Sequence, residues 1–129
     1  MPRNKTDKPT ERELDLLKVL WERGPSSVRE VSELLNRSED LSFTTVQTML
    51  QVMFDKDLVS RELMGRSLIY TAKAKREETE KAMVGDLLER LFSGSAQQLL
   101  ARALDVKKAS PEELRAIQTL INKARKGKV

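Results

Sequence analysis

The sequence predicts a mostly α-helical (α+β) protein, in which three helices precede one β-hairpin and further helices follow it. Apolar residues recur every three or four positions over most of the 129 residues, as in helices with one buried face. Between about residues 58 and 71 this spacing gives way to two short β-favouring runs on either side of Met64-Gly65-Arg66, which predicts a hairpin. The helical pattern returns at Ala72 and continues to the end.

Composition excludes several classes of function. The length fits one domain, or a small domain with an appendage. There is no apolar segment long enough to cross a bilayer and no signal peptide, so we expect a cytoplasmic protein without membrane insertion. The chain contains no Cys and no His, which removes disulfides, thiolate metal sites and the commonest general base. We therefore expect no enzyme, no metal and no cofactor.

The first two helices each begin with a capping box. Thr10 with Glu13 predicts a helix start, and Gly24-Pro25 breaks that helix after about Glu22. Ser27 with Glu30 predicts the next, shorter helix, and residues 36 to 40 read as a polar connection. The residues expected to face inward are Leu14, Leu17, Leu20 and Trp21 in the first helix, and Val28, Val31, Leu34 and Leu35 in the second.

The third helix, from a Ser42 cap to about Lys56, has an unusual composition. The run from Leu41 to Phe54 has no charge in a chain that is 34% charged, which would arise at a given place roughly 0.3% of the time by chance. One face is apolar, with Val46, Met49, Leu50, Met53 and Phe54. The opposite face carries only hydroxyl and amide groups, from Thr44, Gln47, Thr48 and Gln51.

An exposed helix face normally carries Lys and Glu, so a face with only neutral polar groups is unusual. Base edges in the DNA major groove provide an explanation, because Gln bonds adenine bidentately and Thr offers a hydroxyl and a methyl group. Three helices followed by a hairpin is also the order of the winged helix-turn-helix, whose third helix lies in the major groove. Packing of this face against the rest of the protein is the alternative.

Three further amphipathic helices follow the hairpin. Ser93-Gly94 separates the first two, and Ser110-Pro111 with Glu113 predicts the start of the last. Helices of this size bury too little apolar surface to be stable alone, so we expect them to form a homodimer. The predicted dimerisation residues are Met83, Val84, Leu87, Leu88, Leu91, Leu99, Leu100, Leu114, Ile117, Leu120 and Ile121.

Several of these segments resemble the penicillinase-repressor (BlaI/MecI/CopY) family of winged-helix transcriptional regulators. The resemblance covers about residues 10 to 122. It is carried by Glu13-Leu-Asp-Leu-Leu-Lys-Val-Leu-Trp21, Thr45-Val-Gln-Thr-Met-Leu50, Lys56-Asp-Leu-Val59 and Gly65-Arg66 to Tyr70. It implies a homodimeric repressor on a palindromic double-stranded DNA operator, with a flexible tail (1–9), a DNA-binding domain (10–72) and a helical dimerisation region (73–129).

The predicted DNA-binding residues follow from the helix face, from the resemblance and from the hairpin. They are Ser42, Thr44, Thr45, Gln47, Thr48, Gln51 and Arg66. Gln47 is the first candidate for a base contact and Gln51 the second, whereas Thr44 and Thr45 fit phosphate equally well. Ser42, Arg29 and Lys56 can each be explained as a cap or surface charge, and Arg61 as a surface charge.

One feature of this chain departs from the family pattern, and a second argues against DNA binding. Where relatives that are inactivated by proteolysis carry Asn-Phe, this chain has Arg102-Ala103. The first 75 residues are almost neutral, since the net charge of +4 comes mainly from the rest of the chain. The alternative function is therefore a winged-helix module that binds another protein and not DNA.

Overall fold

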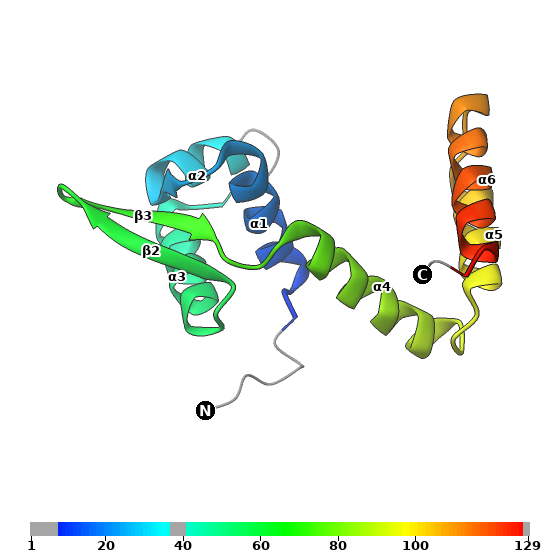
Figure 1. Ribbon diagram of the computed structural model, residues 1–129. Helices are drawn as coiled ribbons and strands as arrows, with labels where there is room; N and C mark the ends of the chain where they lie inside the picture. The colour runs from blue at the N-terminus through cyan, green and yellow to red at the C-terminus, as the bar shows by residue number, and fades with distance from the viewer. Residues whose placement is uncertain (1–7, 37–40, 128–129) are drawn as a thin grey trace. The chain divides into compact units, whose positions relative to one another are not determined.

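The computed structural model describes residues 8–36 and 41–127 (Figure 1). The chain divides into two compact units, Met1–Val84 and Gly85–Val129. Residues 1–7 of the expected N-terminal tail and residues 37–40 of the expected polar connection lie outside the described residues. The elements are α1 (Glu11–Arg23), β1 (Ser26–Ser27), α2 (Val28–Leu35), α3 (Phe43–Asp55), β2 (Val59–Met64), β3 (Ser67–Ala72), α4 (Arg76–Leu91), α5 (Ala96–Val106) and α6 (Pro111–Arg125).

Side-chain caps start the helices of the first unit where the sequence predicts them. The Glu13 amide donates to Thr10 Oγ1 at 3.2 Å, and the Thr10 amide donates to Glu13 Oε1 at 2.9 Å. Ser27 and Glu30 form the same reciprocal pair at the start of α2. Both predicted capping boxes are confirmed, and each satisfies two backbone groups that helix ends leave without partners.

The first unit has one apolar core, to which α1, α2, α3 and the hairpin contribute. Its buried side chains are Leu16, Leu17, Leu20, Val28, Val31, Leu35, Val46, Leu50, Met53, Leu58, Val59 and Tyr70. The predicted face of α1 omitted Leu16, which is fully buried, and included Leu14, which is only half-buried. The buried face is wide because α1 packs against α2, α3 and β3 at once. Leu34, predicted to face inward in α2, is also only half-buried.

The sheet consists of the hairpin that was predicted, formed by β2 and β3, and of one additional short strand, β1. Its order is β1-β3-β2, and both pairings are antiparallel. Met64 pairs with Ser67, so Gly65 and Arg66 form a two-residue turn, in which Gly65 has a φ of +63°. A positive φ suits glycine because it has no Cβ. In Figure 1 the hairpin projects from the three helices as the wing of a winged-helix fold, which confirms the predicted fold class.

The second unit contains the end of α4 together with α5 and α6. The chain turns after α4 with positive φ at Ser93 (50°) and Gly94 (84°). Ser95 caps α5. Ser110 caps α6 and Pro111 is its first residue, which confirms the predicted start of this helix. Neither α5 nor α6 contains a buried residue, and none of the predicted dimerisation residues is buried in the single chain. Their apolar faces therefore need a further surface to cover them.

In the part of the chain that is described, every helix is too short or too polar for a membrane span.

Candidate nucleic-acid interface

Helix α3 separates its apolar and neutral polar residues onto opposite faces. Val46, Leu50 and Met53 are fully buried in the core. The predicted DNA-reading residues of α3 are all exposed, namely Thr44, Thr45, Gln47, Thr48 and Gln51. The alternative, that this neutral face packs against the rest of the protein, does not hold within the first unit. The hydroxyl and amide groups are thus available to an external partner.

Ser42 and Thr45 form a small hydrogen-bonded cap at the start of α3. The Thr45 amide donates to Ser42 Oγ at 3.1 Å, and the Ser42 hydroxyl donates to Thr45 Oγ1 at 2.9 Å. The two side chains thus bond to each other as well as to the backbone at the helix start. The first turn of α3 also contains no acidic residue that would repel an anion.

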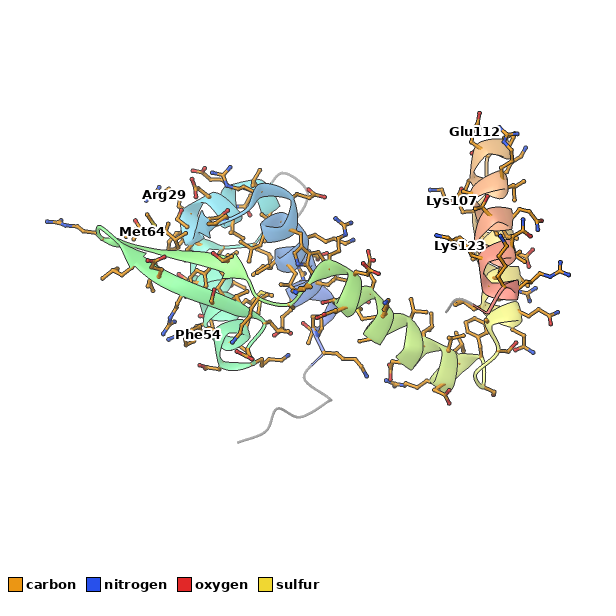
Figure 2. All side chains as sticks on the ribbon, in the orientation of Figure 1. Arg29, Phe54, Met64, Lys107, Glu112 and Lys123 are labelled. Carbon is orange, nitrogen blue, oxygen red and sulfur yellow. The ribbon has the colours of Figure 1, made fainter. Side chains whose placement is uncertain are left out.

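A concave groove brings together residues from α2, α3 and the wing. Arg29 of α2, Gln47 of α3 and Arg66 of the hairpin turn line it, with Phe43 and Leu68 among its apolar members. Figure 2 marks Arg29 on α2 and Met64 at the end of β2. Two arginines thus line the same groove as Gln47, the first candidate for a base contact. Sequence reasoning gave no preference to Arg29, since its place beside the wing is a tertiary feature.

The carboxylate of Glu30, in the first turn of α2, forms an ion pair with Arg23. Glu30 Oε1 accepts from the Ser27 amide at 2.9 Å, and Glu30 Oε2 accepts from Arg23 at 2.6 Å. The Ser27 amide, and then Arg23, hold the pKa of Glu30 below its ordinary value. The acidic residue next to Arg29 is therefore ionised and already has a cationic partner.

Two other basic residues that the sequence left undecided have structural contacts. The guanidinium of Arg61 lies 4.0 Å from the centre of the Phe54 ring and donates to the Tyr70 hydroxyl at 3.5 Å. This contact joins the wing to the C-terminal end of α3. Phe54 was predicted on the buried face, but it is 37% exposed, and its ring contacts Arg61 of the wing and not the apolar core.

Lys56 is paired with a buried carboxylate. Its Nζ lies 2.7 Å from Glu13 Oε1, and the Glu13 side chain is only 7% exposed. Lys56 is the C-cap residue of α3, and Glu13 stands in the first turn of α1. The pair therefore fixes the end of α3 against the start of α1.

A family model described as penicillinase repressor matches residues 9–123, which is most of the chain. This chain belongs to the penicillinase repressor family. Among curated relatives of this family member, the penicillinase repressor of Bacillus licheniformis is 24% identical over 109 residues, which is 84% of this chain and 85% of that protein. The transcriptional regulator BlaI of Mycobacterium tuberculosis is 35% identical over 88 residues, or 67% of this chain and 64% of that protein.

A solved structure supports the fold of this penicillinase repressor family member. The YusO protein from Bacillus subtilis aligns with a TM-score of 0.54 at 19% identity, over 94% of this chain and 78% of that one. At this identity the likeness shows the fold alone. The family match confirms the resemblance to penicillinase repressors that the sequence segments of α1, α3 and the wing carry.

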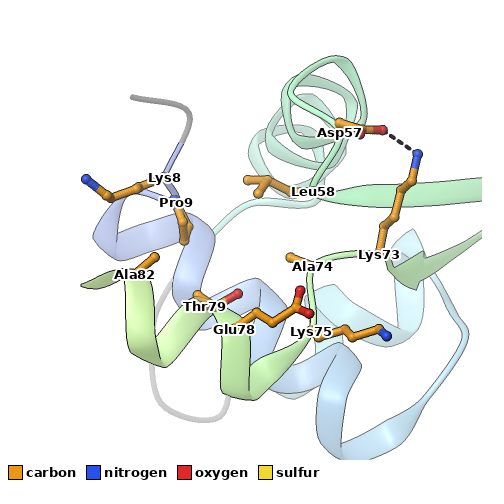
Figure 3. A pocket seen from close by; sticks show the side chains of 10 residues that line it. All are labelled: Lys8, Pro9, Asp57, Leu58, Lys73, Ala74, Lys75, Glu78, Thr79 and Ala82. Atoms are coloured by element: carbon orange, nitrogen blue, oxygen red, sulfur yellow. Dashed lines mark hydrogen bonds and ion pairs between the residues drawn. The ribbon is translucent and has the colours of Figure 1, made fainter. Parts of the chain in front are cut away.

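A second concave region of the first unit surrounds the connection between β3 and α4. Figure 3 shows its lining, which includes Leu58, Ala74, Thr79 and three lysines. Lys73 is paired with Asp57 at 2.6 Å, and the ammonium groups of Lys8 and Lys75 point away from the pocket. The lysines that line it therefore do not form a site for an anion.

Proposed function

We propose that this chain is a sequence-specific DNA-binding repressor of transcription that acts as a homodimer on a palindromic operator. The observation that carries the proposal is the exposed, uncharged polar face of α3. The family membership supports it, since the relatives are named as a penicillinase repressor and a transcriptional regulator. In this proposal residues 10–72 read DNA and residues 73–129 form the dimer.

The side chains on α3 suit the edges of base pairs. A major groove accommodates one α-helix, and the 13 residues of α3 make a helix about 20 Å long. Gln47 and Gln51 lie one turn apart, so each can approach a different base pair. Each good bidentate pair discriminates by about 1–3 kcal/mol against a wrong base. Thr44 and Thr48 add hydroxyl donors and methyl groups that can contact thymine.

Phosphate contacts orient the helix in the groove. The positive end of the α3 dipole and the Thr45 hydroxyl lie at its start, where a phosphate is favourable. Arg29 and Arg66 border the groove from α2 and from the wing, so they suit the two sides of a DNA strand. A few cationic side chains at these positions suffice for contacts with phosphate, although the first 75 residues are nearly neutral.

The apolar faces of the last three helices support dimerisation. Leu87 is 42% exposed in α4, Leu114 is 47% exposed in α6, and Leu120 of α6 is 64% exposed. Exposed apolar surface of this kind is normally covered by a partner. A second copy with the same faces gives a two-fold symmetric dimer, whose two reading helices select half-sites in inverted repeat.

A protein-binding winged helix is the second candidate, favoured by the near-neutral first 75 residues. Fluorescence anisotropy with labelled genomic and random duplexes, over a series of salt concentrations, separates the two functions. A DNA-reading protein binds both pools at low salt and retains selected genomic fragments as salt rises. A protein-binding module binds neither pool at any salt concentration.

Gln47→Ala then tests the reading face itself. Its affinity for a selected fragment should fall by about 1–3 kcal/mol and its preference should relax at one base pair, with little change on random DNA. Gln97→Ala is the matched control, because Gln97 is an exposed glutamine on α5, outside the reading unit (residues 10–72). An equal loss on random and selected DNA would make Gln47 a phosphate contact and remove its reading role.

A further inference from the structure

The connection between β3 and α4 is held from several directions within the first unit. The amides of Lys73 and Ala74 both donate to the Leu58 carbonyl, at 2.9 and 3.0 Å. The Lys73 ammonium lies 2.6 Å from Asp57 Oδ1, and Figure 3 marks this pair with a dashed line. Connecting segments are generally more mobile than the elements that they join, and these three contacts hold this one to the residues that follow α3.

Trp21 of α1 provides a further contact from the helical side. Its indole Nε1 donates to the Ala74 carbonyl at 2.9 Å, across 53 positions in the sequence. The Arg76 guanidinium, at the first position of α4, lies 5.6 Å from the centre of the Trp21 ring. Trp21 packs at the margin of the core and is only half-buried. Packing in the core alone would not require the indole N–H, whereas the hydrogen bond to Ala74 does.

Helix α4 connects the two units, so its attachment to the first unit matters. It has 16 residues without a break, begins in the first unit and ends in the second. Such a helix is about 24 Å long. A rotation of about 10° at its start would move its far end by about 4 Å, which exceeds the base-pair step of about 3.4 Å. A loosely attached α4 could therefore not define the distance between two reading helices to one base pair.

We propose that Trp21 is a positioning residue, which anchors the start of α4 to the reading unit and so sets the half-site spacing that the dimer accepts. This inference rests on the proposed function. The indole N–H holds Ala74, the ring face holds Arg76, and the two contacts together restrict the direction in which α4 leaves the reading unit.

Selection of full-length protein on a random duplex library tests this inference and needs no operator of known sequence. The wild type should enrich inverted repeats with one spacing, and should bind that spacing about tenfold more tightly than spacings one base pair longer or shorter. Trp21→Phe keeps an aromatic ring for Arg76 but removes the donor to Ala74. It should enrich the same half-site at several spacings, with a preference of less than about threefold.

Arg76→Ala provides a second variant that leaves the core untouched, since the Arg76 side chain is 51% exposed. It should broaden the spacing in the same direction, and it decides the question if Trp21→Phe does not fold. Arg90→Ala is the matched control, because Arg90 also pairs with a carboxylate of α4 four residues away, Asp86. It should retain the single spacing of the wild type.

The outcomes separate this inference from the function on which it rests. If the wild type enriches no inverted repeat, the proposed function fails, and the inference fails with it. If the wild type enriches a dyad and both variants retain its single spacing, Trp21 is a structural residue only and the inference alone is overturned. A changed half-site sequence would also overturn it, because the anchor should alter spacing and not base reading.

Discussion

Replacement of Glu13 tests how the end of α3 is positioned. Glu13 Oε1 accepts from the Thr10 amide at 2.9 Å and from Lys56 Nζ at 2.7 Å, and its side chain is 7% exposed. Glu13→Gln retains the shape and an amide oxygen that can still accept from the Thr10 amide. It removes the negative charge, so the contact with Lys56 becomes an ordinary hydrogen bond or is lost.

The size of the effect follows from the degree of burial. A hydrogen bond to a charged group stabilises by about 1.5–3 kcal/mol, against about 1 kcal/mol for a neutral one. Lys56 is 23% exposed, so water partly compensates, and we expect Glu13→Gln to cost about 1–2 kcal/mol. Glu13→Ala also removes the acceptor for the Thr10 amide and should cost about 2–3 kcal/mol in total.

Urea unfolding followed by tryptophan fluorescence measures this loss where it occurs. Trp21 is the only tryptophan, and it lies on α1 like Glu13, so its emission reports on the unfolding of the reading unit. Glu11→Gln is the matched control, since Glu11 is an exposed acidic residue in the same first turn. The control should change stability by less than about 0.5 kcal/mol. Equal losses in the two variants would refute the role of the Glu13–Lys56 pair.

Three further predictions concern the wing, the dimer and acid stability. Arg66→Ala should weaken binding to all DNA sequences and lower the salt slope by about one unit in an anisotropy series, and an unchanged slope would contradict a phosphate contact. Leu87→Asp should shift the chain from dimer to monomer in analytical ultracentrifugation, because a charge in an apolar interface is strongly unfavourable, and a full-strength dimer would contradict the interface. The pKa of Glu30 is lowered from 4.5 in the folded chain, so its stabilisation is complete above that pH and is lost as the pH falls through the folded value. Glu30→Gln should therefore show a weaker fall in urea midpoint between about pH 5 and pH 3 than the wild type, and an identical fall would contradict this.

The sequence predicted those features that depend on neighbours a few positions away. Thr10 with Glu13 and Ser27 with Glu30 are local pairs, so the starts of α1 and α2 could be placed from the sequence alone. The two-residue strand β1 could not be placed in this way. Ser26 and Ser27 carry no strand periodicity, and they form a strand only by pairing with Tyr70 and Ile69.

The candidate site shows the same division between local and tertiary information. The neutral face of α3 was predicted because its residues lie at helical spacing in one uncharged run. The groove that joins Arg29 to Arg66 was not, since it depends on how α2 packs beside the wing. The bond from Trp21 to Ala74 was also beyond the sequence, because a tryptophan at the end of an apolar stripe gives no sign of its indole partner.

The most direct test of the central claim is an NMR titration of the side-chain amides with a selected operator duplex. The chain has five glutamines, of which Gln47 and Gln51 lie on the exposed face of α3, while the other three (Gln97, Gln98 and Gln118) lie on α5 and α6. If α3 reads bases, the amide signals of Gln47 and Gln51 should move strongly on the operator and less on a scrambled duplex. If those two signals stay in place while the operator is bound, the neutral face of α3 does not read DNA.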